Sequence, residues 1–218
     1  MRQGYAAGVV SEQLSEWITE GRLAPEAKVS EAWVAGELQV SRNTVREAFR
    51  LLAHDGLLVH EFNRGVFVAP VTAADVRDVY RVRRIIETAV VRSLQPDDRH
   101  RLGALAELVG AARTAAGHGD WVEVGTANMR FHRALVALAG SPRLDLTMRR
   151  LAAELRLVFA VSRDPQRFFE PFVERNSSLV DLMAADRFEQ AADYLDRYLA
   201  DSERAILAAF ADRAPTLD

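Results

Sequence analysis

Apolar residues in the first part of the chain recur at helical spacing and predict three short helices. The first of these helices ends at Gly21, and the second and third begin at Ser30 and Ser41, residues of a kind that caps helix N-termini. The residues predicted to face the core here are Val9, Val10, Leu14, Trp17, Ile18, Val34, Ala35, Leu38, Val45, Ala48, Phe49 and Leu52. Only Gln39 and Val40 separate the second helix from the third, so this pair matches a helix-turn-helix.

Two β-rich runs follow the third helix and predict a hairpin. Gly56 ends the helix, residues 57–62 and 66–68 form the two runs, and Asn63-Arg64-Gly65 provides the turn between them. A hairpin directly after a helix-turn-helix makes a wing. We therefore predict that residues 1–70 form a winged helix-turn-helix with a two-stranded wing.

The remaining chain has a helical pattern throughout, with no alternating strand pattern. Thr72-Ala73-Ala74-Asp75 resembles a capping box and opens a helix that reaches about Leu94. Start and stop residues predict five further helices, at about 96–117, 120–140, 141–162, 171–185 and 186–213. The segment from Arg163 to Glu170 is predicted to be a loop, with Pro171 in the first turn of the helix after it. Residues 71–218 are thus expected to form an all-α six-helix bundle, and the whole fold is expected to be mainly α.

Composition narrows the function classes. About half of the 218 residues are hydrophobic, which is enough for real cores, but no apolar run is long enough to span a membrane. We expect no membrane association and a cytoplasmic location. The absence of cysteine excludes disulfides, thiolate zinc sites and cysteine nucleophiles, so any metal would need histidine or carboxylate ligands.

The charge distribution restricts how the chain could bind DNA. Its net charge of −3 is not the basic footprint of a generic nucleic-acid binder. Residues 1–70 carry seven cationic and nine anionic side chains, a net charge of −2. DNA binding would therefore depend on a local patch.

The third predicted helix can supply such a patch. Arg42, Arg46 and Arg50 recur every fourth residue and form a stripe beside the apolar face. The planar fork of arginine can bind guanine O6 and N7, or a phosphate, through two hydrogen bonds. The alternative from this helix alone is a solvated surface with three ordinary arginines.

The segment from Val34 to Ala69 resembles the winged helix-turn-helix of GntR-family bacterial transcription regulators. The motifs that carry the resemblance are VSRNTVREAFRLLAHDGLLV and, after it, RGVFVA. The resemblance implies DNA contacts by three groups: the major groove by Ser41, Arg42, Asn43, Thr44 and Arg46, a phosphate by Arg50, and the minor groove by Arg64 with Gly65. Many family members have a basic residue after the glutamate that matches Glu31, whereas this chain has Ala32, which implies one missing contact.

Residues 71–218 resemble the FCD effector domain of the fatty-acid-regulator subfamily. The segment DVYRVRRIIETAV is similar to its first helix, and ANMRFHRALVALAGSP to its most specific motif. Members of that family bind small organic acids inside the bundle, often through a divalent metal held by one aspartate and three histidines. The matching positions in this chain are Asn128, His132, Asn176 and Tyr198. Only His132 is an expected ligand.

This donor set favours direct ligand binding over metal binding. Neutral amides and a phenol are poor ligands for zinc or nickel, so we predict no tightly bound metal and no cofactor. The same side chains can form hydrogen bonds to a polar effector. A carboxylate would also need a cation. Arg83 matches an arginine of the family's first effector-domain helix, Arg156 lies on the helix that usually lines the cavity, and we favour Arg83.

Purely structural roles for these residues stay open. His132 could be a packed histidine and Tyr198 a core residue. The other four histidines are expected to be exposed: His54, His60, His100 and His118.

The combined prediction is a ligand-responsive DNA-binding transcription regulator. By resemblance it would be a homodimeric repressor, released from a palindromic double-stranded operator by a small carboxylate effector. Residues 1–70 would bind DNA, and residues 71–218 would bind the effector and form the dimer. One alternative is a helical domain that serves only as a dimerisation scaffold. An enzyme in the bundle is a remote alternative, because only His132 is a plausible base and no nucleophile or glycine-rich phosphate loop is evident.

Overall fold

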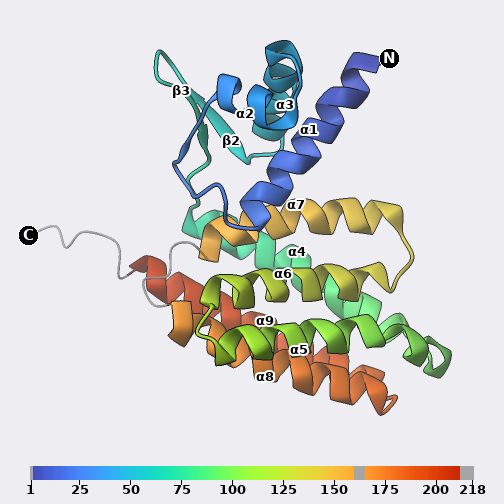
Figure 1. Cartoon of the computed structure of the whole chain (residues 1–218). Coiled ribbons are helices and arrows are strands. Elements are labelled where there is room, and N and C mark those ends of the chain that lie inside the picture. The colour runs from blue at the N-terminus through green and yellow to red at the C-terminus, as the bar shows by residue number, and fades with distance from the viewer. Residues whose placement is uncertain (1, 160–164, 212–218) are drawn as a thin grey trace, which may run out of the picture. The chain divides into compact units, whose positions relative to one another are not determined.

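The computed structural model describes residues 2–159 and 165–211, which are mostly helical with one small sheet (Figure 1). The chain divides into two compact units, residues 1–71 and 72–218. Each unit has a hydrophobic core of its own.

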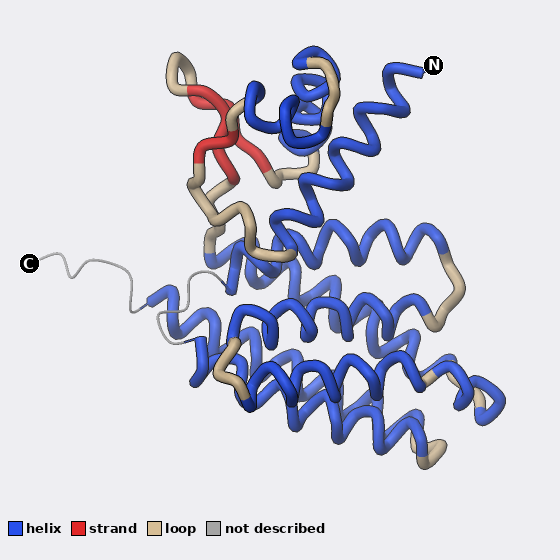
Figure 2. Tube along the Cα trace, in the orientation of Figure 1, coloured by secondary structure: helices blue, strands red, loops and turns tan. Residues whose placement is uncertain are grey.

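The described part of the first unit contains three helices and a three-stranded sheet (Figure 2). The helices are α1 (Arg2–Thr19), α2 (Glu31–Leu38) and α3 (Arg42–His54), and the strands are β1 (Lys28–Val29), β2 (Leu58–Glu61) and β3 (Gly65–Val68). The central strand β3 is antiparallel to both neighbours, and Glu61 pairs with Gly65 at the hairpin end. The predicted hairpin is therefore confirmed. The sheet gains a third strand because two residues before α2, too few to show a pattern, pair with the free edge of β3.

The core of this unit lies between α1, α3 and the sheet. It contains most of the predicted inward residues, among them Leu14, Trp17, Ile18, Val34, Val45, Ala48, Phe49 and Leu52. Val9 was predicted to face inward, but its side chain is 50% exposed, whereas Val10 is 3% exposed. Consecutive residues on a helix point about 100° apart, so only one of the two can face the core.

The described part of the second unit is a six-helix bundle, as predicted. Its α-helices are α4 (Ala73–Ser93), α5 (Gly103–Gly117), α6 (Trp121–Ala137), α7 (Pro142–Phe159), α8 (Pro165–Ala184) and α9 (Phe188–Ala211). The capping box at Thr72 is present, because Thr72 N donates to Asp75 Oδ2 at 2.8 Å and Asp75 N donates to Thr72 Oγ1 at 3.3 Å. Helix α6 packs against α4, α5, α7 and α8 and therefore occupies the centre (Figure 1).

Two predicted helix boundaries were wrong. The single helix expected from Pro96 is a 3₁₀ helix, η1 (Pro96–Arg101), followed by α5. Helix α8 begins at Pro165 instead of Pro171, so the described part of the predicted loop is helical and Pro171 lies inside α8. The predicted ends near Ser162 and Arg213 lie outside the described residues.

Aromatic packing explains the early start of α8. Phe168, Phe169 and Phe172 on α8 surround Phe159 of α7, with ring centroids 5.1–6.2 Å from it. Burial of large rings contributes several kcal/mol and can offset the roughly 3 kcal/mol cost of an interior proline. The position of Pro171 in the sequence alone could not show that ring burial offsets the cost of the proline.

We expect Pro171→Ala to stabilise the protein. Alanine restores an N–H donor inside α8 and removes the steric conflict of the proline ring, so the free energy of unfolding should rise by about 1–3 kcal/mol. Urea unfolding of the whole chain measures this difference. The control Pro142→Ala, at the first position of α7 where proline is favourable, should give no gain. A decrease for Pro171→Ala would instead indicate a helix that starts at Pro171.

Candidate functional site

Helix α3 buries one face and exposes another that could contact DNA. Val45, Ala48 and Phe49 are at most 1% exposed. The N-cap Ser41 accepts a hydrogen bond from Thr44 N at 3.1 Å, which fixes the start of the helix. The predicted DNA-facing residues that are exposed are Ser41, Arg42, Asn43, Arg46 and Arg50. Thr44 differs, because it is 7% exposed and its hydroxyl lies 2.8 Å from Ser41 Oγ, so it supports the cap.

Acidic neighbours hold two of the arginines on this surface. Arg46 Nε donates to Glu31 Oε2 of α2 at 2.9 Å, and Arg50 Nη1 donates to Glu47 Oε2 at 2.9 Å. The arginine side chains remain 58% and 73% exposed. Exposed pairs of this kind contribute only about 0–1 kcal/mol, so a phosphate or a base can replace the carboxylate.

The wing places Arg64 and Gly65 at its hairpin end. Gly65 has a φ of 115°, and a β-carbon there would lie 3.2 Å from Lys28 Cε. Lys28 on β1 therefore adds a cation that was not predicted for this site, since a two-residue strand is too short to show a pattern. Phe62 in the turn is 91% exposed and was also missed. An apolar ring exposed beside cations is a known way to contact a minor groove.

Inside the bundle, the four side chains matched to the family's metal site form one hydrogen-bonded group. Asn176 Nδ2 donates to Asn128 Oδ1 at 2.9 Å, and the Tyr198 hydroxyl lies 3.4 Å from both Asn128 Oδ1 and His132 Nε2. All four residues have between 2% and 4% of their surface exposed. They come from α6, α8 and α9. We call these four residues the polar cluster.

Helix α4 extends the polar cluster with an ion pair. Arg83 Nε donates to Glu87 Oε1 at 2.7 Å, and Glu87 Oε2 lies 2.6 Å from His132 Nδ1. Both α4 side chains are buried. Sequence reasoning missed Glu87, although its position four residues after Arg83 was an available sign. The favoured cation Arg83 is thus already paired with an internal carboxylate.

Burial and charge together set the protonation states. Burial alone would raise the pKa of Glu87, but the charge of Arg83 and the hydrogen bonds from Arg83 and His132 outweigh burial and lower it. Burial lowers the pKa of His132, so the ring is uncharged at neutral pH. Its Nδ1–H then donates to Glu87, and Nε2 can accept from Tyr198. Burial also raises the pKa of Tyr198, which keeps its hydroxyl protonated.

Three buried polar atoms near the polar cluster have no hydrogen-bond partner within the described residues. They are Tyr80 Oη, Arg83 Nη2 and Asn176 Oδ1. A buried polar atom left without a partner costs about 1–3 kcal/mol. Such atoms favour a site that a polar ligand completes.

The donor set of the polar cluster does not fit the divalent metal of the family. Asn128 Oδ1 is engaged by Asn176, and His132 Nδ1 by Glu87. That leaves His132 Nε2 as the single imidazole donor, beside a phenol and neutral amides, which are weak ligands for such metals. Among residues 2–159 and 165–211, no three histidine or carboxylate side chains gather in a way that could hold an ion.

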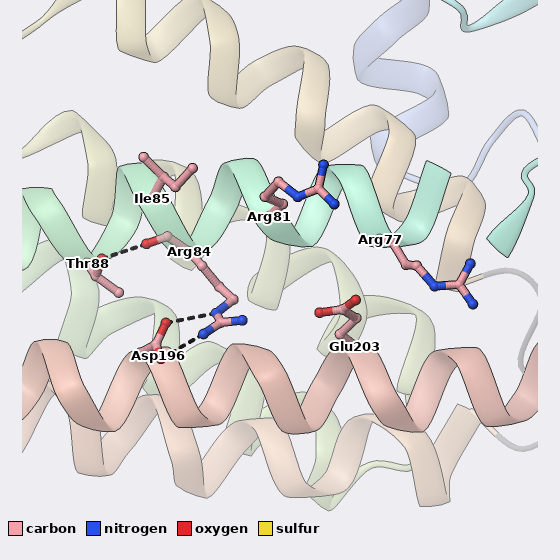
Figure 3. A pocket seen from close by; sticks show the side chains of 7 residues that line it. All are labelled: Arg77, Arg81, Arg84, Ile85, Thr88, Asp196 and Glu203. Carbon is pink, nitrogen blue, oxygen red and sulfur yellow. Dashed lines mark hydrogen bonds and ion pairs between the residues drawn. The ribbon is translucent and has the colours of Figure 1, made fainter. Parts of the chain in front are cut away.

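A separate groove of about 460 Å³ lies between α4 and α9 on the outside of the bundle (Figure 3). Arg84 donates two hydrogen bonds to Asp196, at 2.8 and 2.9 Å, and so ties the two helices together. Figure 3 shows Arg77 and Arg81 on α4 with Glu203 on the facing helix α9. These side chains are charged and at least partly exposed, so this groove is distinct from the buried polar cluster.

The lowered pKa of His132 predicts a loss of stability in acid. An unfolded histidine takes up a proton as the pH falls below about 6.5, whereas buried His132 resists it. The unfolded state then binds more protons, so the free energy of unfolding falls from about pH 7 toward pH 5, by at most about 1.4 kcal/mol per pH unit. The lowered pKa of Glu87 has the same sign, and its contribution is lost at lower pH.

Urea unfolding across this pH range measures the effect. His132→Gln should flatten the dependence whatever its absolute stability. His118→Gln, which replaces an exposed ring, should keep the wild-type slope. Equal slopes for wild type and His132→Gln would contradict a buried, uncharged His132.

Comparison with known proteins identifies the two units. The profile described as "FCD domain" matches residues 78–201, and that described as "Bacterial regulatory proteins, gntR family" matches residues 6–68. A solved structure described as a putative transcriptional regulator GntR from Rhodococcus sp. RHA1 is 42% identical, covers 95% of this chain and 98% of its own, and superposes with a TM-score of 0.83. No helix within the described residues has the length and apolar character to cross a membrane.

Two curated relatives agree with this assignment. The uncharacterized HTH-type transcriptional regulator YdhC of Bacillus subtilis (strain 168) is 32% identical over 126 residues, which is 57% of this chain and 56% of that protein. The probable D-xylose utilization operon transcriptional repressor of Paenarthrobacter nicotinovorans is 27% identical over 183 residues, covering 84% of this chain and 80% of that protein. The chain therefore belongs to the GntR family of DNA-binding bacterial transcription regulators, with an FCD effector-binding domain.

Proposed function

We propose that this protein is a homodimeric repressor that a small organic acid releases from a palindromic operator. Residues 1–70 would bind DNA, and residues 71–218 would bind the effector and hold the dimer. The observation that supports effector binding is the buried polar cluster, with the unpartnered Asn176 Oδ1 inside it and two further unpartnered atoms on α4 near it. A bundle that served only as a scaffold would be more stable with an apolar core, because buried polar groups without partners cost free energy.

The DNA-binding side of the proposal rests on exposed residues. The outer face of α3 would enter the major groove with Ser41, Arg42, Asn43 and Arg46, while Arg50 binds a phosphate. Thr44 would act mainly through the cap. Arg64 and Gly65, with Lys28 beside them, would approach the minor groove. A two-fold symmetric dimer presents two α3 helices to two half-sites, which is why a palindrome is expected.

Effector binding would act by changing the population of protein arrangements. An acid that binds better to the form with low operator affinity shifts the equilibrium toward that form. Coupling of about 1–3 kcal/mol is typical and changes operator affinity by roughly 5- to 150-fold. Such coupling is sufficient for release.

Arg46→Ala tests the proposed major-groove contact. If Arg46 binds a guanine through two hydrogen bonds, its loss should weaken operator binding by about 1–3 kcal/mol and relax the preference at one base pair. Fluorescence anisotropy measures this on a duplex that the wild-type protein selects from a random pool. Arg50→Ala should weaken binding to all sequences alike and lower the salt dependence. Unchanged operator affinity in Arg46→Ala would exclude the proposed role.

Thermal unfolding with a panel of small organic acids, each with and without zinc, tests the effector site. An acid present at about 100 times its dissociation constant should add roughly 2.7 kcal/mol to the free energy of unfolding and raise Tm without zinc. The double variant Asn128→Leu/Asn176→Leu removes a bonded pair together and should lose this shift. A rise that depends on zinc would mean that the polar cluster does hold a metal. No rise with any acid would favour the scaffold alternative.

A further inference from the structure

Arg156 on α7 is a buried cation without an acidic hydrogen-bond partner in the described part of the chain. It is 9% exposed, and its Nη1 donates to Val122 O at 3.4 Å. Burial lowers its pKa, and the charge of Glu123 opposes that effect without outweighing it. Burial of a charge without a close counter-ion is costly, so this position is suited to an anion from outside the chain. Arg83, by contrast, already has Glu87 at 2.7 Å.

Gly125 on α6 makes the space in which Arg156 lies. A β-carbon at this position would lie 2.8 Å from both Arg156 Nη1 and Phe169 Cζ. Any larger residue would therefore displace the guanidinium or the ring. At Gly110, also inside a helix, an added β-carbon would meet nothing within 4 Å. Gly125 thus lets a cation and an aromatic ring lie together against the backbone of α6.

Along both α6 and α8, the residue that lies near Arg156 comes before a residue of the polar cluster. Along α6, Gly125 is followed by Asn128 three residues later, about 4.5 Å along the axis. Along α8, Phe169 and Phe172 are followed by Asn176 at helical spacing. The contacts follow the same order along both helices, because Gly125 adjoins Phe169 and Asn128 bonds Asn176. The site therefore has a cation at one end and amides at the other.

Aromatic rings connect these two ends. The Phe169 and Phe172 centroids are 6.2 Å apart, and Phe172 lies 5.9 Å from Tyr198 of the polar cluster. The arrangement of Phe169 and Phe172 is edge-to-face, which is a favourable geometry for aromatic rings. Aliphatic hydroxyl groups placed against these rings would lose their hydrogen bonds. These aromatic side chains thus favour a ligand with a flat apolar ring over a sugar acid.

We propose that the effector is an aromatic carboxylate with a hydrogen-bond donor on the far side of its ring, the chemistry of a hydroxybenzoate. Its carboxylate pairs with Arg156, its ring packs against Phe169 and Phe172, and its hydroxyl donates to Asn176 Oδ1, the buried acceptor without a partner. This inference rests on the proposed function, because it names the class of acid for the same effector domain. It replaces Arg83 with Arg156 as the anion-binding residue.

Isothermal titration calorimetry of the full chain with four probes tests the ligand class. The probes are 4-hydroxybenzoate, benzoate, 4-hydroxybenzamide and glutarate. We expect 4-hydroxybenzoate to bind most tightly. Benzoate should bind about tenfold more weakly, because Asn176 Oδ1 stays unpaired, and the uncharged amide should bind at least about tenfold more weakly, because Arg156 stays unpaired.

Two variants test the position of the anion. Arg156→Gln and Gly125→Ala should each weaken 4-hydroxybenzoate binding by about tenfold or more, the first by removing the charge and the second by displacing it. The matched controls Arg113→Gln, at an exposed arginine of α5, and Gly110→Ala should bind as wild type does. If Arg156→Gln does not fold, Gly125→Ala and the comparison of acid with amide on the wild type still test whether Arg156 binds the carboxylate.

The outcomes separate this inference from the proposed function. Binding of glutarate without binding of 4-hydroxybenzoate overturns the aromatic class and leaves an acid-responsive regulator. Tight 4-hydroxybenzoate binding that neither variant weakens overturns the role of Arg156. Absence of binding by all acids, in a panel extended beyond these probes, overturns both.

Discussion

The bundle depends on how buried charges are neutralised by other side chains. Glu87 is shared between Arg83 on its own helix and His132 on α6, and the chain of hydrogen bonds continues to Tyr198 on α9 and to Asn128 and Asn176. Loss of one member of a buried charged group leaves the others uncompensated, at a typical cost of about 3–5 kcal/mol. Four helices are therefore held in one relative arrangement by polar contacts as well as by apolar packing.

The two units position their functional side chains in different ways. In the first unit, helix caps and a tight turn fix the backbone, and the arginine side chains remain exposed and weakly paired. Weak pairing suits groups that must exchange a protein partner for DNA. In the bundle, each polar side chain is fixed by neighbours from other helices. Fixed donors and acceptors suit recognition of a small molecule, because little conformational entropy is lost on binding.

Local patterns account for what the sequence could predict. The apolar face of α3, the β2–β3 hairpin and the six helices of the bundle follow from periodicity, caps and turn residues, which depend on near neighbours. The position of Pro171 inside α8 did not follow from them, because it depends on contacts with Phe159 of the preceding helix α7. The third strand was missed because two residues carry no period.

In the candidate site, too, contacts between residues far apart in the sequence could not be predicted. Family resemblance singled out Asn128, His132, Asn176 and Tyr198, and the structure brings them into contact. The sequence places Glu87 four residues after Arg83, but it cannot show that Glu87 also pairs with His132, which lies 45 residues away. The preference for Arg83 over Arg156 rests on resemblance alone and stays a prediction, although Arg83 is already paired with Glu87. A charge is available to a ligand only where no internal counter-ion occupies it, and that depends on tertiary contacts.

The pairing of Arg46 with Glu31 and of Arg50 with Glu47 has a further consequence for how the protein samples a chromosome. A phosphate that takes either arginine leaves an unpaired carboxylate facing an anionic polymer, in a unit that is acidic overall. Random DNA supplies phosphates without the matching base edges, so binding there would give little net gain. The operator sequence would add base-edge hydrogen bonds that offset the repulsion. In the proposed DNA contacts, the acidic residues would thus act against retention on the wrong sites and favour selectivity.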